Sequence, residues 1–247
     1  YNIIIIQREK KKIMTKTPNL EIFNNSWQIY QEIIRFNYME HQDIYSELKK
    51  YITKNYPEPF SFLELGCGDA FYSAKSLTDT AISHYVGVDL SQPALNLAKQ
   101  NLNGLNCSVE LKQVEMWEFL ECYSLSFDLI LISFALHHLS SSQKQALLNK
   151  CYHHLNAGGA LLLIDIFCRE REPRPEYLKR YCNYVESQWQ KIERSDLDLA
   201  LEHITSSDFP ESIATFRTWA EIIGFNQVEV IYNGTFEAHN AITFYRK

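Results

Sequence analysis

Short and almost wholly apolar runs recur through the middle of the chain, and amphipathic stretches separate them. The clearest two are residues 127–133 and 160–166, and the second follows an Asn-Ala-Gly-Gly turn. An unbroken apolar run of this length is typical of a strand that is buried on both faces. Strands of this kind that alternate with helices form a parallel sheet with helices on both sides and right-handed crossovers. The sequence therefore predicts an α/β fold.

The expected elements follow one another in a regular order. Strands are expected at residues 61–65, 84–88, 107–114, 127–133, 160–166, 227–232 and 241–245. Helices are expected at residues 22–55, 69–77, 92–102, 142–154 and 211–223, the last one ending at Gly224. Residues 167–209 break this alternation, because they are charged and mostly helical in pattern.

A glycine turn ends the first apolar run, in the stretch FLELGCGDAF at residues 62–71. Gly66 and Gly68 allow the backbone of such a turn to approach a ligand closely. In open parallel sheets, ligands bind at the carboxyl ends of the strands, beside the point where the strand order reverses. We therefore expect this turn to line the binding site.

Two residues of the turn argue against a dinucleotide as the ligand. The dinucleotide fingerprint has a third glycine, and Phe71 stands in its place. A pyrophosphate would lie at the N-terminus of the following helix, where the carboxylate of Asp69 would repel it. S-adenosylmethionine has no phosphate and carries a sulfonium and an ammonium, which suit Glu64 and Asp69. Asp89, which follows the second strand, can accept hydrogen bonds from both ribose hydroxyls.

Several segments together resemble the class I S-adenosylmethionine-dependent methyltransferases, in their small-molecule branch. FLELGCGDA resembles the first motif of that family and VGVDLS the second. QVEMWEF resembles the segment that contacts adenine, FDLILISFALHHL the fourth-strand segment, and LNAGGALLLID the turn and strand after it. The resemblance covers residues 58–166 and, more loosely, residues 211–247. Residues 16–57 and 167–209 carry no shared signature.

The resemblance implies a Rossmann-like fold: a seven-stranded, mostly parallel sheet flanked by helices, with a helical cap. We expect the chain to divide into a disordered tail or extension (1–15), an N-terminal helical cap (16–57), a cofactor-binding core (58–166), a helical lid (167–209) and the rest of the core (210–247). Within the tail, Met14 is a candidate natural start.

The cofactor implied is S-adenosyl-L-methionine. The residues expected to bind it are Glu64, Gly66, Cys67, Gly68, Asp69, Asp89, Leu90, Glu115, Met116 and Ser133. Two alternatives stay open from the residues alone: Glu64 as a brace of the first turn, and Asp69 as a helix N-cap.

A histidine pair, His137 and His138, follows the fourth strand at the mouth of the expected site. Either residue is a candidate general base or substrate donor, and packing under the loop is the alternative. Adjacent side chains usually point apart and no third ligand is evident, so the sequence predicts no metal site.

Aromatic residues mark the regions that are expected to cover the acceptor. The candidate substrate contacts are Tyr30, Tyr38 and His41 in the N-terminal helices, and Tyr177 and Tyr181 in the lid. A tyrosine offers an apolar body and a polar hydroxyl, and core packing is the alternative for each.

Composition limits the kinds of partner and the cellular compartment that can be expected for this protein. Lys and Arg number 24 and Asp and Glu number 30, a net charge of −6 that disfavours nucleic acid. The six cysteines form no CxxC pair, which favours reduced thiols in the cytoplasm. The apolar run at residues 3–6 is too short for a signal peptide or a membrane span.

The sequence therefore predicts a cytoplasmic enzyme, monomeric or homodimeric, with no nucleic-acid or membrane partner. We expect it to transfer a methyl group to nitrogen or oxygen of a small-molecule acceptor by in-line displacement. Methylation of RNA or protein is one alternative. A non-catalytic S-adenosylmethionine-binding module is another.

Overall fold

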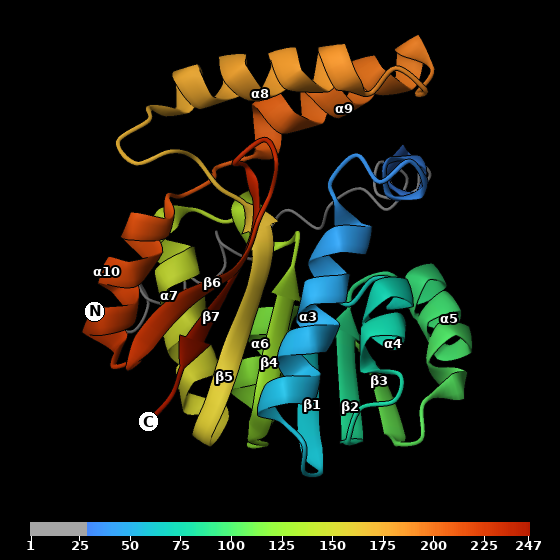
Figure 1. Ribbon diagram of the computed structural model, residues 1–247, viewed down its shortest axis with the longest axis vertical. Coiled ribbons are helices and arrows are strands. Elements are labelled where there is room, and N and C mark those ends of the chain that lie inside the picture. Colours follow the sequence, from blue (N-terminus) through green and yellow to red (C-terminus); the bar gives the residue numbers. More distant parts are fainter. Residues whose placement is uncertain (1–28) are drawn as a thin grey trace, which may run out of the picture.

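A single seven-stranded sheet organises the protein, which a computed structural model describes from residue 29 to residue 247 (Figure 1). The strands are β1 (Phe60–Leu65), β2 (Ile82–Asp89), β3 (Ser108–Gln113), β4 (Phe127–Ser133), β5 (Leu155–Ile166), β6 (Gln227–Asn233) and β7 (His239–Tyr245). Their order is β3-β2-β1-β4-β5-β7-β6, and only β7 runs antiparallel to its neighbours. The expected mostly parallel α/β fold is confirmed.

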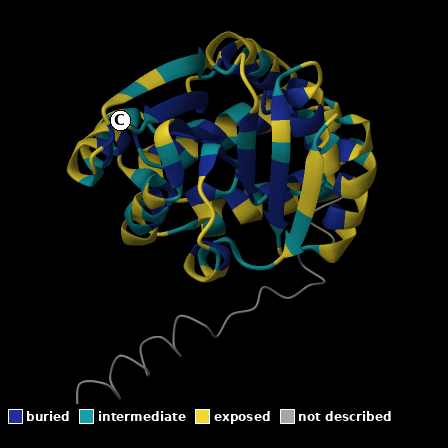
Figure 2. Ribbon diagram, turned by 90° about the horizontal axis from the view of Figure 1, so that it is seen from below, coloured by how far each residue is buried: buried dark blue, intermediate teal, exposed yellow. Residues whose placement is uncertain are grey.

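Helices cover both faces of the sheet and the carboxyl end of its parallel strands (Figure 1). They are α3 (His41–Asn55), α4 (Phe71–Leu77), α5 (Gln92–Asn101), α6 (Met116–Cys122), α7 (Ser141–His153), α8 (Arg174–Gln188), α9 (Arg194–Ser207) and α10 (Ile213–Ile223), with 3₁₀ turns η1 (Leu102–Gly104) and η2 (Leu136–His138). The strands alternate between two cores: Phe62 of β1 packs with α3, α4 and α5, whereas Leu63 packs with α6, α7 and α10. Figure 2 shows the buried strands enclosed by helices whose outer faces are exposed.

The strand order reverses at β1, because β2 and β3 lie on one side of it and β4 on the other. The carboxyl ends of β1, β2 and β4 therefore meet at one edge of the sheet, where a ligand is expected. Helices α8 and α9 extend above this end of the sheet in Figure 1. Tyr38 stacks on Trp189, which follows α8, with ring centroids 5.6 Å apart, so residues from both predicted covering regions contact each other.

The expected elements are present, with differences that have local causes. The helix expected at 22–55 is interrupted before α3, because Asn37 and Glu40 both have φ of 57°. Helix α4 begins at Phe71 rather than at residue 69, because Ala70 is in the left-handed region. Strand β5 begins at Leu155, which pairs with Phe127 ahead of an irregularity in the register. The predicted tail and its start at Met14 lie outside the described residues.

Within residues 29–247, no helix combines the length and the apolar character that crossing a membrane requires.

Candidate functional site

The glycine turn follows β1 and is bonded to the neighbouring strand. The backbone N–H groups of Gly66 and Cys67 both donate to the Val88 carbonyl, at 2.8 and 2.9 Å. Gly66 and Gly68 have φ of 75° and 51°, which residues with a Cβ rarely adopt. A Cβ on Gly66 would lie 3.3 Å from the Cβ of Ala135, in the loop after β4. The loops after β1 and β4 therefore meet closely at this turn.

Asp89, at the end of β2, holds the turn in place through its carboxylate. One oxygen accepts the N–H of Gly68 at 2.8 Å, and the other accepts the N–H of Ser91 at 2.7 Å. Ser91 caps α5, as expected, by accepting the N–H of Ala94. Burial raises the pKa of Asp89. One carboxylate thus fixes both the glycine turn and the start of α5.

Glu64 is an acid inside β1, only 2 % exposed. The hydroxyls of Ser73 and Tyr85 donate to its two oxygens at 2.7 and 2.5 Å. Burial raises the pKa of Glu64 to about 7, and the carboxylates of Asp69 and Asp89 act in the same direction. From the sequence, Glu64 could either bind the cofactor or brace the turn. The two hydrogen bonds connect Glu64 to α4 and β2, as a brace would.

Asp69 completes a group of three carboxylates, defined here as Glu64, Asp69 and Asp89. It accepts the N–H of Phe71 at 3.1 Å, and burial raises its pKa. Among the described residues, no cationic side chain forms an ion pair with any of the three. Glu64 is buried and Asp69 and Asp89 are half-buried. Carboxylates in such surroundings that lack a cationic partner create a region of negative potential, which favours a positively charged ligand.

Five rings form an aromatic cluster beside this group. Its members are Tyr30, His41, Tyr45, Tyr72 and Phe134. The Tyr45 hydroxyl donates to Ser133 at the end of β4, at 2.8 Å. Burial and the carboxylates of Asp69, Asp165 and Glu64 raise the pKa of Tyr30, which locates this ring in the field of the acids.

His41 lies at the centre of the aromatic cluster, with its ring centroid 4.6 Å from that of Phe134 and 5.5 Å from that of Tyr72. Its Nε2 pairs with the Tyr30 hydroxyl at 3.1 Å, whereas its buried Nδ1 has no hydrogen-bond partner in the described part of the chain. Burial lowers the pKa of His41 to about 3, so the ring is neutral. A buried polar atom without a partner is a suitable contact for a ligand.

The backbone is strained next to this cluster. Phe134 has φ of 47°, and its N–H donates to the Ile164 carbonyl of β5 at 2.8 Å, which helps to hold it there. A non-glycine residue in this region costs about 1–3 kcal/mol, and such residues concentrate at functional sites. Strain at the carboxyl end of β4 therefore agrees with a ligand site there.

Known proteins are similar to this chain in sequence and in fold. A model described as a methyltransferase domain matches residues 62–159. The carboxy-S-adenosyl-L-methionine synthase of Pseudoalteromonas translucida is 25 % identical over 217 residues, 84 % of this chain and 86 % of that protein. The enzyme of the same name from Mannheimia succiniciproducens is 29 % identical over 176 residues, 68 % of this chain and 69 % of that one.

A solved structure agrees at the level of the fold. Magnesium protoporphyrin IX methyltransferase from Synechocystis PCC 6803, with bound S-adenosylhomocysteine (SAH), superposes with a TM-score of 0.61 at 13 % identity. The match covers 91 % of this chain and 94 % of that one. Residues 62–159 therefore match a methyltransferase domain, and the relatives and the fold agree with the class I S-adenosylmethionine-dependent methyltransferases that the motifs predict. The cofactor class of this chain is S-adenosyl-L-methionine, which confirms the family and cofactor expected from the motifs.

The other cofactor-site residues predicted for this methyltransferase lie around the same turn or on the loops next to it. Met116 begins α6, and its Cε would be 3.8 Å from a Cβ on Gly66. Glu115 caps α6 by accepting the N–H groups of Trp117 and Glu118. Cys67 is buried in the turn, whereas Leu90, after β2, is exposed. Their contacts with the cofactor stay predictions.

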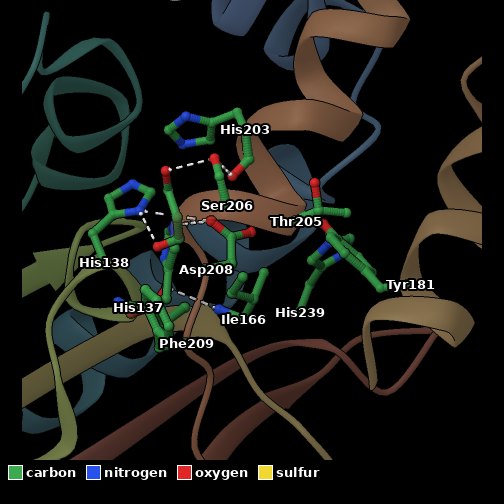
Figure 3. A network of polar contacts seen from close by, with 12 residues as sticks. His137, His138, Ile166, Tyr181, His203, Thr205, Ser206, Asp208, Phe209 and His239 are labelled. Atoms are coloured by element: carbon green, nitrogen blue, oxygen red, sulfur yellow. Dashed lines mark hydrogen bonds and ion pairs between the residues drawn. The ribbon is translucent and has the colours of Figure 1, made fainter. Parts of the chain in front are cut away.

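The histidine pair differs from the expectation (Figure 3). The two rings do not point apart: their centroids are 3.9 Å apart, because η2 is a tight 3₁₀ turn. His137 is buried and bonds through Nδ1 to Asp165 of β5, which also accepts its backbone N–H at 3.0 Å. Asp208, directly after α9, lies beside both rings, with its Oδ1 3.7 Å from Nε2 of His137 and 3.6 Å from Nδ1 of His138. The catalytic role predicted for either histidine stays a prediction.

The predicted substrate contacts fall into two groups. Tyr30 and His41 belong to the aromatic cluster, and Tyr38 accepts the N–H of Lys191 at 2.9 Å. Tyr177 and Tyr181 are fully buried and stacked on each other, and the Tyr181 hydroxyl bonds to His239 of β7 at 2.9 Å. The Tyr181–His239 hydrogen bond attaches α8 to the sheet, and substrate contact by Tyr177 and Tyr181 stays a prediction.

Several residues at the site were not singled out from the sequence, among them Tyr45, Tyr72, Phe134, Asp165 and Asp208. A tyrosine on the buried face of a helix gives no local signal that it lies near a ligand site. Phe134 could have been predicted as a site residue, because it directly follows the fourth strand and ligands bind at the carboxyl ends of the strands.

Proposed function

We propose that this protein transfers the methyl group of S-adenosylmethionine to a nitrogen or oxygen atom of a small molecule. The proposal rests on the three carboxylates around the glycine turn, for which residues 29–247 supply no cationic partner. S-adenosylmethionine supplies a methyl group that its sulfonium has already activated. In the proposed site, Asp89 holds the ribose hydroxyls, and Glu64 and Asp69 stabilise the cationic end of the cofactor.

The remaining work of this chain is to position the acceptor and to exclude water. We assign this to the aromatic cluster, because its rings are largely buried and it adjoins Ser133 at the end of β4. His41 is neutral and has one nitrogen without a hydrogen-bond partner among the described residues, so it can orient a polar group on the acceptor. Helices α8 and α9 are proposed to form the lid.

Two measurements test this function. Calorimetry with S-adenosylmethionine and SAH should detect binding of both. A methyl-release assay over amines, phenols, carboxylates and quinol precursors should identify an acceptor. Binding without methylation of any small molecule, RNA or protein would support the alternative of a non-catalytic binding module.

The relatives suggest a second candidate, because their name describes synthesis of a carboxylated S-adenosylmethionine. In that reaction class the cofactor itself gains the carboxyl group. The aromatic cluster disfavours it here, because its five side chains carry no positive charge at neutral pH that would attract a carboxylate. Mass spectrometry of S-adenosylmethionine after incubation with carboxylate donors distinguishes the two: a carboxylated product would replace our proposal.

Replacing His41 with phenylalanine tests the role of the aromatic cluster. We expect the KM for the acceptor to rise about tenfold, because a hydrogen bond worth about 1–1.5 kcal/mol is lost while the stacked ring remains. The affinity for SAH should stay within about twofold. The control is Tyr51→Phe, which removes another buried polar atom from α3 without touching the cluster. A rise in KM for the control alone would contradict the assignment.

A further inference from the structure

Three potential metal-binding atoms converge where the lid meets the core. Nε2 of His137 is 3.7 Å from Oδ1 of Asp208, and Nδ1 of His138 is 3.6 Å from the same oxygen. All three atoms lie within 4.8 Å of one another. Figure 3 shows the Asp208 carboxylate directed at both rings. The residues come from two elements that are far apart in the sequence, η2 and the end of α9.

One carboxylate oxygen of Asp208, Oδ1, is buried and has no hydrogen-bond partner within residues 29–247. Asp208 is 3 % exposed, and no hydrogen bond reaches its Oδ1 from the described residues. The two nearby cationic side chains bond elsewhere: Arg174 donates to the Asp208 backbone carbonyl at 2.8 Å, and Lys144 donates to the Phe209 carbonyl. A buried carboxylate oxygen without a partner is costly, and a metal ion removes that cost.

The separations favour zinc over an octahedral ion. Two ligands at 2.0–2.1 Å from a tetrahedral ion are about 3.3–3.4 Å apart, whereas neighbouring octahedral ligands at that distance are about 2.9 Å apart. The observed 3.6 and 3.7 Å exceed hydrogen-bond length and lie closer to the tetrahedral value. Two imidazoles and one carboxylate also form a ligand set that zinc accepts, with the fourth position left for water.

The surroundings of the rings also suit a metal site. Asp165 bonds to Nδ1 of His137 and to its backbone N–H, which leaves Nε2 directed at Asp208. Metal-binding histidines usually have such a carboxylate on their other nitrogen. The His138 side chain is 39 % exposed, which gives an ion a path from solvent. Its Nδ1 is also 3.3 Å from the Ser207 carbonyl, a long contact that metal binding would replace.

We propose that His137, His138 and Asp208 form a zinc site that ties the end of α9 to the turn after β4. Asp165 is a positioning residue in this site. A backbone hydrogen bond already joins the same two segments, because the Phe209 N–H donates to the His137 carbonyl at 2.9 Å. Zinc would reinforce this attachment of the lid.

The test is zinc chloride titration of the full chain by calorimetry, after chelator treatment and dialysis. We expect one equivalent to bind and cobalt(II) to give the intense visible absorption of a tetrahedral site. Asp208→Asn and His138→Gln should each weaken zinc binding at least tenfold, and Asp165→Asn should weaken it about 10- to 100-fold. The control, His153→Gln, removes an exposed imidazole from α7 and should leave zinc binding unchanged.

SAH titration of every variant separates the possible failures. A variant that still binds SAH is folded. If the unaltered chain does not bind SAH, that result contradicts the proposed function and not the zinc proposal. His138→Gln decides the question if Asp208→Asn does not fold, because the His138 side chain is partly exposed. The zinc proposal is overturned if the unaltered chain binds no stoichiometric zinc, or if His138→Gln binds it as tightly as the unaltered chain.

Discussion

Replacing Asp89 with alanine is expected to weaken the binding of S-adenosylmethionine and SAH by at least about 100-fold. The substitution removes the proposed acceptor for the ribose hydroxyls. It also leaves the N–H groups of Gly68 and Ser91 without their partner, at about 1–3 kcal/mol each. Calorimetry with SAH measures the loss. Asp198→Ala, on the exposed side of α9, is the control for the removal of one negative charge.

A second ligand separates ribose recognition from bracing of the turn. SAH and an analogue without the two ribose hydroxyls should differ strongly in affinity for the unaltered protein. If Asp89 contacts those hydroxyls, Asp89→Ala should bind the two ligands about equally, because the preference is lost with the carboxylate. If the variant still prefers SAH by the original factor, Asp89 acts only by holding the turn, and our assignment is wrong.

The sheet and the glycine turn could be predicted because their signals are local. The apolar composition of residues 127–133 is enough to predict a buried strand. Strand β4 has the same bounds, Phe127–Ser133. Gly66, Gly68 and Asp89 lie within 24 residues of one another in the chain, in a strand–turn–helix–strand unit whose geometry varies little. The cofactor class followed from which side chains that unit presents.

The contacts between the core and its covering helices could not be predicted in this way. The partner of His137 and His138 is Asp208, 70 residues later than His138, and no periodicity relates the two. The expectation that adjacent rings point apart holds for a strand, but residues in a 3₁₀ turn are only about 120° apart. The aromatic cluster is likewise assembled from four separate segments: helical residues 29–35, α3, α4 and the loop after β4.

Replacing Glu64 with glutamine should have opposite effects on stability and on cofactor binding. The pKa of Glu64 is about 7 in the folded protein, raised from its ordinary value of 4.5, because burial disfavours the charged form. The folded state therefore holds the proton more tightly, and stability falls as pH rises from about 4.5 to 7. Above pH 7 the loss amounts to about 3 kcal/mol. Glutamine removes this loss, so the variant should melt several degrees higher at pH 8.

Cofactor binding should change in the other direction. The ionised carboxylate attracts the cationic end of S-adenosylmethionine, so the affinity of the unaltered protein should rise with pH up to about 7, with proton release below that pH. Glu64→Gln should bind more weakly at pH 8, by about 10- to 100-fold for a partly buried charge pair. The difference should shrink towards pH 5.5, where Glu64 itself is largely neutral.

Thermal unfolding and calorimetry at pH 5.5, 7 and 8 measure both effects. Glu221→Gln, an exposed acid on α10, changes the net charge equally and should change neither the melting temperature nor the affinity. If Glu64→Gln is more stable at pH 8 but binds S-adenosylmethionine as the unaltered protein does, Glu64 braces the turn without contributing to recognition. If it is less stable at pH 8, the hydrogen bonds from Ser73 and Tyr85 outweigh the burial of the charge. In that case the buried acid stabilises the fold, and the proposed conflict between stability and cofactor binding does not exist.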